Sequence, residues 1–281
     1  MSIIEADGIK FLDGIAGEYI VVESDRIVDY IEYINKNEVK SIYLCDLYYL
    51  NKEVDFLKQC NFIERLNITS SAIENYQGLS YLHRLKELSL NEPKGKVDLG
   101  NHMDLKSLSV EFNRNIVGME QLKNLKKLSL WNYKPKSKNL SEISELKAVQ
   151  ELEVIKSSIN SLNGSGNLLN LERLKLGYLN QLSYIDELEK IRERLKVLNF
   201  ESCKKIVNHE YVACLNNLEE LSFNECGNIE TINFINKMPN LKRFIFMGTN
   251  IIDGNLQSCE RLEYVAFTNK KHFSHKNFDF Q

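Results

Sequence analysis

Two histidines near the C-terminus have the spacing of a metal-binding pair. His272 and His275 form an H-x-x-H motif, and Asp279 follows four residues later. On a helix, such a pair can hold a zinc ion when a third ligand completes the site. The flanking residues lack a helical pattern and the sequence assigns no third ligand. We therefore expect neither a metal nor a cofactor.

Other reactive residues give equally weak indications of catalysis. The six cysteines contain no C-x-x-C pair, and scattered free thiols are typical of a reducing cytosol. Cys45 is expected at an exposed strand position, but the first histidine in the chain is His83. The acids Glu151 and Glu153 share one strand without a pocket. The GSG at 164–166 lacks the lysine of a phosphate loop and reads as a turn. These patterns predict no enzyme.

Composition and charge exclude further classes of function. Thirty-six Lys and Arg oppose 39 Asp and Glu, giving a net charge of −3, whereas nucleic-acid binders carry a basic excess. The N-terminus has acidic residues where a secretion signal needs a basic head. No run approaches the roughly 18 apolar residues that span a bilayer. We expect a soluble, cytoplasmic monomer that binds neither nucleic acid nor membrane. Few prolines and many Lys, Asn and Ile residues suggest a bacterial source.

An apolar-x-x-apolar-x-apolar pattern recurs along most of the chain. Successive copies begin 20 to 24 residues apart, a period typical of solenoid repeats. The pattern predicts about eleven units, each with a short strand whose first, fourth and sixth positions point inward. The third, fifth, seventh and eighth positions should then face solvent. The units begin at Val39, Ile63, Leu85, Leu105, Leu125, Val149, Leu171, Leu195, Leu218, Leu241 and Leu262.

Residues 39–267 resemble the leucine-rich repeat family, in the 22-residue style of bacterial internalin-type repeats. The resemblance implies an α/β solenoid: a curved array with a parallel β-sheet on its concave side and mixed helices and turns on its convex side. It also implies a column of small polar residues at position nine, after each strand. Six units match this column, with Ser71, Asn113, Ser157, Cys203, Cys226 and Thr249. Cys203 and Cys226 are therefore expected to be structural thiols.

A second apolar column lies three residues before each unit after the first, and it is interrupted at two points. His102 and Arg192 stand where other units have Leu, Met or Cys. At Arg192 we expect a helix with its N-terminal cap at Ser183, because Ile185, Leu188 and Ile191 then share one face. We have no comparable explanation for His102.

The segments outside the repeats are expected to cover the ends of the solenoid, because terminal repeats otherwise expose apolar faces. The pattern of residues 1–38 predicts an N-terminal cap. It would contain a hairpin that turns around Gly14 and Gly17, then a helix with Asp25 as N-cap. The helix would bury the isoleucines at 27, 31 and 34. Residues 268–281 predict a C-terminal tail whose phenylalanines at 273, 278 and 280 fold over the last repeat.

Trp131, the sole tryptophan, occupies an outward position of its strand. Large apolar residues surround it at positions seven and eight of neighbouring units, which is the composition of an interface hot spot. The alternative is that Trp131 packs under its own loop, on Tyr133 or Pro135. The candidate partner-binding residues are Glu111, Phe112, Trp131, Asn132, Ile155, Lys156, Lys175, Tyr178 and Glu201.

Charge on this face changes sign along the array. Lys156, Arg173 and Lys175 make a basic group, and the acids Glu201, Glu220 and Glu225 follow. Such a pattern can set the register of a complementary partner, although it can equally be an ordinary solvated surface.

The expected function is a non-enzymatic scaffold that binds another protein on its concave face. By resemblance, one such role is an intracellular bacterial binder or an immunity protein that inhibits a toxin. A substrate-recognition subunit of an enzyme complex, of effector or ligase type, is one alternative. A host-binding surface protein is the other. The identity of the partner is not encoded in these patterns.

Overall fold

The computed structural model describes residues 2–13 and 19–280, and the chain divides into two compact units, Met1–Lys127 and Leu128–Gln281. In the first unit the main sheet follows chain order and begins antiparallel, because β1, β2 and β3 form two hairpins. From β3 onward its strands are parallel. The strands are β1 (Ser2–Ala6), β2 (Ile9–Asp13), β3 (Tyr19–Val21), β4 (Ser41–Leu44), β5 (Arg65–Ile68), β6 (Glu87–Leu90) and β8 (Ser107–Glu111).

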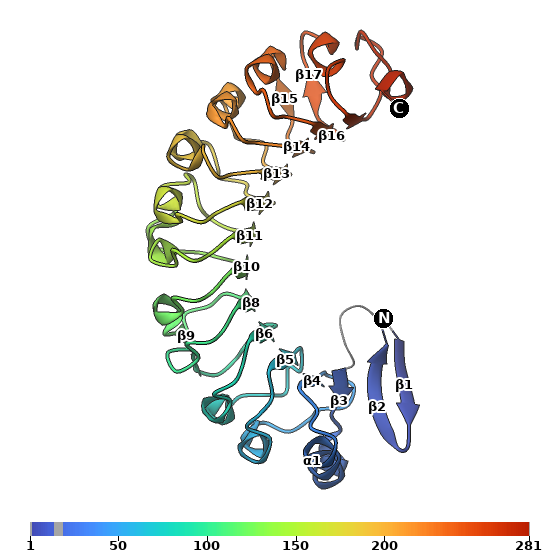
Figure 1. The fold of residues 1–281 in the computed structure, drawn as a ribbon, viewed down its shortest axis with the longest axis vertical. Helices are drawn as coiled ribbons and strands as arrows, with labels where there is room; N and C mark the ends of the chain where they lie inside the picture. Colours follow the sequence, from blue (N-terminus) through green and yellow to red (C-terminus); the bar gives the residue numbers. More distant parts are fainter. Residues whose placement is uncertain (1, 14–18, 281) are drawn as a thin grey trace. The chain divides into compact units, whose positions relative to one another are not determined.

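In the second unit the strands are again parallel and follow chain order. They line one side of the unit, and short helical turns line the other (Figure 1). The strands are β10 (Lys127–Trp131, whose first residue ends the first unit), β11 (Glu151–Ile155), β12 (Arg173–Gly177), β13 (Val197–Glu201), β14 (Glu220–Asn224), β16 (Arg243–Phe246) and β18 (Tyr264–Phe267).

The segments between strands contain short 3₁₀ helices, one α-helix and two small parallel pairs. The α-helix is α1 (Ile27–Lys36), and the pairs are β7 (Val97–Asp98) with β9 (Ile116–Val117), and β15 (Asn228–Ile229) with β17 (Asn250–Ile251). The 3₁₀ helices are η1 (Ser24–Arg26), η2 (Asp55–Gln59), η3 (Gln77–Tyr81), η4 (Met119–Gln121), η5 (Ser141–Ile143), η6 (Ser165–Asn167), η7 (Asp186–Ile191), η8 (His209–Cys214), η9 (Asn233–Lys237), η10 (Gln257–Cys259) and η11 (Asn277–Phe280). No helix among the described residues has the length and apolar character needed to cross a bilayer.

The inward positions of the repeat form the core, as the sequence predicts. Residues one, four and six of each segment are buried, except Val39 and Leu262, which are half-buried near the two ends. The parallel register sets equivalent residues side by side, so Leu174 lies between Leu152 and Leu198. Strands in a sheet are about 4.8 Å apart, so each leucine packs against its counterparts in the adjacent repeats.

Side chains of the position-nine column form hydrogen bonds with backbone carbonyls. In one repeat the bonding residue is at position eight instead. Cys203 Sγ donates to the carbonyl of Leu176 (3.4 Å), and burial raises the pKa of this thiol to about 11, which keeps it a donor. Cys226 does the same with Phe200, so both cysteines are structural. At the β5 end the buried hydroxyl is that of Ser70, and Ser71 is exposed. The prediction of Ser71 was wrong because that turn is one residue shorter.

Thr249 provides a direct test of this column. Its hydroxyl donates to the Phe223 carbonyl and accepts from the Cys226 N–H, and the side chain is fully buried. We expect Thr249→Val, which keeps the shape, to lower the free energy of unfolding by about 1–3 kcal/mol because it leaves two buried backbone groups unpaired. Urea denaturation measures this loss. Thr249→Ser is the control that keeps the hydroxyl, and an equal loss in both variants would show that packing matters rather than hydrogen bonding.

The two breaks in the second apolar column have different explanations. The segment with Ile185, Leu188 and Ile191 is buried as predicted, but it is the 3₁₀ helix η7, without a side-chain cap. Ser183 instead donates to the Gln181 carbonyl, so the predicted cap is wrong. A 3₁₀ helix has three residues per turn, which suits apolar residues spaced exactly three apart. His102 is buried in the column in place of a leucine.

The ends of the chain match the predicted elements in part. β2 and β3 form the expected hairpin, but its turn at Gly14 and Gly17 lies outside the described residues. Asp25 does not cap α1, which begins at Ile27 after η1 and buries Tyr30 and Ile34 most completely. In the tail, Phe273 is buried against Phe267 and Phe246. Phe280 contacts the Phe267 ring, whereas Phe278 is exposed, contrary to prediction.

Candidate functional site

The strand face of the second unit carries the predicted partner-binding residues that this unit contains. We define the strand face as the side chains at outward positions three, five, seven and eight of the repeats that contain β10 to β14, β16 and β18. Glu111 and Phe112 belong to the first unit, where Glu111 ends β8, and both are half-buried and hold interactions of their own. The remaining residues are Trp131, Asn132, Ile155, Lys156, Lys175, Tyr178 and Glu201.

Trp131 is 43% exposed at the end of β10. Its ring makes no contact with another aromatic ring of the described chain, and Tyr133 is instead fully buried. The alternative in which Trp131 stacks on Tyr133 is therefore not what the structure shows. An indole with nearly half its surface exposed leaves apolar area uncovered, which is the property of an interface anchor.

Ile155 and Gly177 continue the row from Trp131. Asn132 N–H donates to the Ile155 carbonyl (3.0 Å), as Lys156 N–H does to the Gly177 carbonyl (2.9 Å). Because these two hydrogen bonds are equivalent in successive repeats, Trp131 lies opposite Ile155, just as Ile155 lies opposite Gly177. A Cβ on Gly177 would lie 2.7 Å from Ile155 Cδ1, so the isoleucine side chain extends over the glycine. Trp131 and Ile155 thus form one apolar row across three strands.

Tyr178 adds a second exposed aromatic side chain, 47% exposed, directly after β12. Its backbone is left-handed (φ 57°), as are those of Asn132 and Lys156. Ser202 and Glu225, at the same position of later repeats, share this conformation. The left-handed turn therefore belongs to the repeat and is not a signal of a specialised site. Its N–H bonds to the next strand hold position eight at the rim of the strand face.

Some outward positions are covered, contrary to the prediction that all of them face solvent. Val197 and Ser222 are buried on the strand face. Val197 lies between Arg173 and Glu220 in the register, and long side chains on adjacent strands cover a smaller one between them. Cys45, after β4, is also buried, because the following turn folds back onto its carbonyl through Tyr48 and Tyr49. The expected surface thiol is wrong.

The acids and histidines with possible catalytic spacing are held in structural contacts. Glu153 accepts a hydrogen bond from Ser129 Oγ (2.7 Å), and Glu151 also has a partner. His272 Nε2 contacts the Ile251 carbonyl (2.9 Å). His275 uses both ring nitrogens, with Ser274 and Glu260. Among the described residues, no group of three His, Cys, Asp or Glu side chains is arranged to hold a metal.

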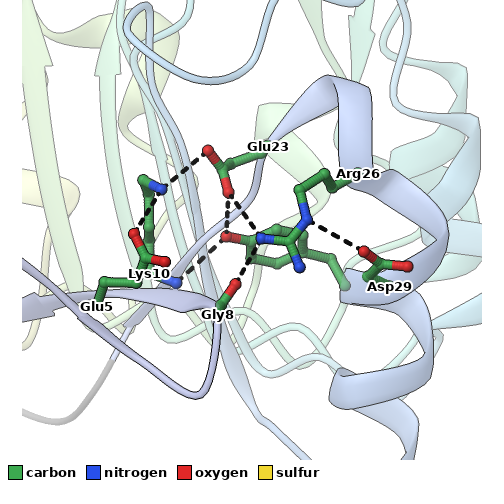
Figure 2. Close-up of polar contacts among 7 residues, drawn as sticks. Glu5, Gly8, Lys10, Glu23, Arg26 and Asp29 are labelled. Carbon is green, nitrogen blue, oxygen red and sulfur yellow. Dashed lines mark hydrogen bonds and ion pairs between the residues drawn. The ribbon is translucent and has the colours of Figure 1, made fainter.

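A charged cluster that no sequence pattern predicts joins the β1–β2 hairpin to α1 (Figure 2). Lys10 Nζ lies 3.0 Å from both Glu5 and Glu23, and hydrogen bonds with these two acids raise the pKa of Lys10. Arg26 donates to the Gly8 carbonyl (2.7 Å) and to Asp29 (3.1 Å). Each cation has an anion beside it, so the cluster stabilises the N-terminal segment. The contacts of Lys10 with Glu23 and of Arg26 with Gly8 join residues 13 and 18 positions apart, so the sequence gave no signal for them.

A polar groove of about 590 Å³ lies beside the strands of the second unit. Its lysines are paired, Lys196 with Glu172 and Lys242 with Glu219, each at 3.0 Å. Its amides are used as well, since Asn170 and Asn217 donate to backbone carbonyls of the preceding repeats. With these groups already satisfied, the groove has less to offer a partner than the strand face.

Comparison with solved structures identifies the class of fold. An internalin from Listeria monocytogenes matches with a TM-score of 0.65 and 20% sequence identity, over 85% of this chain and 71% of that one. A leucine-rich repeat protein of Leptospira interrogans matches with a TM-score of 0.60 and 17% identity, over 85% of this chain and 68% of that one. The chain has the leucine-rich repeat fold. No family model and no curated protein matches its sequence.

Proposed function

We propose that the chain is a non-enzymatic scaffold that binds another protein on the strand face of its second unit. Trp131, Ile155 and Tyr178 form the apolar centre, and Asn132, Lys156, Lys175 and Glu201 form its polar surroundings. The observation that carries the proposal is the exposed indole of Trp131 beside Ile155. Aromatic anchors with polar neighbours are the usual composition of an interface hot spot.

The fold supports the same proposal, because stacked repeats present a long, regular strand face. In this proposal the chain acts as an intracellular bacterial binder, of inhibitor or immunity type. That role rests on likeness to other repeat proteins and not on a motif.

Trp131→Ala is expected to weaken partner binding at least tenfold and leave the melting temperature within a few degrees of wild type. Affinity capture from a lysate of the source organism, with mass spectrometry of the retained proteins, identifies candidate partners. Titration of each purified candidate then measures Kd. Because Trp131 is the sole tryptophan, its fluorescence should shift to shorter wavelength when a partner excludes water from the ring.

The matched control is Tyr184→Ala. Tyr184 is a more exposed aromatic residue in the same unit but lies outside the strands. Equal binding by the wild type and the Trp131 variant would refute the proposed site. A large loss of thermal stability in the Trp131 variant would instead show that the ring belongs to the core.

A further inference from the structure

Two cations on β12 differ from the other cationic side chains on the strands. Lys10 on β2 is paired with Glu5 and Glu23. On β5, Arg65 bonds Ser41 and lies over the Tyr19 ring. On β16, Arg243 pairs with Glu220 (3.4 Å) and lies 4.4 Å from the Tyr264 ring. Lys127 on β10 is also engaged.

Arg173 and Lys175 are exposed, and neither side chain has an ion pair, hydrogen bond or ring contact with another described residue. Glu153 lies opposite Lys175 in the register but bonds Ser129 on the other side. Glu151 lies opposite Arg173 and also has another interaction. Although Glu151 and Glu153 lie on the neighbouring strand, these two adjacent cations therefore form no ion pair with a described residue on the strand face.

The cations and the apolar row lie in line along one strand. Arg173, Lys175 and Gly177 alternate on the outward side of β12, so they are spaced by roughly 6.6 Å, twice the rise per strand residue. Ile155 extends over Gly177, and Trp131 is the next residue of that row. Along β12 the strand face therefore presents two cations, Arg173 and Lys175, followed by an apolar surface at Gly177. An extended partner segment has the same 6.6 Å spacing between alternate side chains.

We propose that the partner presents an extended acidic segment to β12, with two carboxylates two residues apart and a large apolar side chain two residues further on. The carboxylates would pair with Arg173 and Lys175, and the apolar side chain would pack on Ile155 and Trp131. Arg173 suits this role because its guanidinium can hold a carboxylate through two parallel hydrogen bonds. This inference rests on the proposed function and specifies the chemistry of the partner at that site.

The test is selection of a display library of random 12-residue peptides on the full chain. Selected peptides should be enriched in the spacing acid-x-acid-x-apolar, in either chain direction. The double variant Arg173→Glu with Lys175→Glu should weaken their binding at least tenfold. Binding to wild type should also fall as salt rises from 50 to 500 mM, because salt screens exposed charge pairs. The double variant Lys204→Glu with Lys205→Glu changes net charge equally outside the strands and should bind normally.

The outcomes separate this inference from the proposed function. Peptides that require Trp131 but show no acidic preference would overturn the acidic segment and leave the binding site intact. Equal weakening by the two double variants would also overturn it, since net charge alone would then explain the effect. Failure to select any peptide that depends on Trp131 would count against both.

Discussion

Leu174→Asp is expected to unfold the second unit. Leu174 is fully buried in β12, and the register sets it between Leu152 and Leu198. The aspartate would place a carboxylate in an apolar layer without a cation beside it, which costs several kcal/mol in addition to the lost packing. A domain is commonly stable by only about 5–15 kcal/mol. Circular dichroism should show loss of structure, or a urea midpoint far below wild type.

The control is the adjacent residue. Lys175 is exposed on the opposite side of the same strand, with Glu153 opposite it, so Lys175→Asp should lower the free energy of unfolding by only about 1 kcal/mol or less. A cooperative, wild-type unfolding curve for the Leu174 variant would show that the strand faces are reversed. In that case every outward assignment, including Trp131, would be wrong as well, since a shift of one residue exchanges the two faces.

Acid is expected to destabilise the fold through two buried histidines. His209 is only 6% exposed, its ring lies edge-on to Phe223, and its Nε2 has no partner among the described residues. Burial lowers the pKa of His209 from 6.5 to about 4. Burial also lowers the pKa of His102, and a backbone contact with Leu82 opposes this shift only in part.

The direction of this change in stability with pH follows from proton binding. Between pH 6.5 and 4 the unfolded chain binds a proton at His209 and the folded chain does not, so stability is present above pH 6.5 and is lost as the pH falls toward 4. For His209 the loss is about 3 kcal/mol, from 1.36 kcal/mol per pKa unit. Urea denaturation of wild type and His209→Leu at several pH values measures it.

The Leu variant should lose less stability than wild type over this pH range by about that amount. His83→Leu removes an exposed histidine and serves as the control. If wild type and His209→Leu lost stability in parallel as the pH fell, the inferred burial of a neutral His209 would be refuted.

Strand alternation and cap patterns failed where a turn, a neighbouring side chain or the start of a helix decided the outcome. Cys45 was expected outside because it follows the strand alternation, but the turn after β4 encloses it. Val197 was expected to be exposed for the same reason, and side chains of neighbouring strands cover it. The cap predicted at Ser183 is absent, because η7 begins at Asp186 and its N-cap position is Ile185, two residues after Ser183. Each error concerns a contact that sequence spacing does not encode.

The candidate site divides in the same way. The outward position of Trp131 and the list of its neighbours follow from the repeat alone, because alternation along a strand assigns side chains to faces. The sequence also gives the basic group at Lys156, Arg173 and Lys175. It gives no means of telling which cations are paired. That distinction emerged only when the register placed Glu153 beside Lys175 and its hydrogen bond directed it to Ser129.

The sequence by itself determined the repeat, the buried leucine positions and the direction of the strands. These depend on a period of about 22 residues, and a periodic pattern leaves few ways to bury its apolar side chains. Tertiary structure alone decided that Ile155 covers Gly177 and that Arg173 and Lys175 lack ion-pair partners among the described residues. These features depend on side chains more than 20 residues apart in the chain, and their contacts exist only after the repeats have stacked.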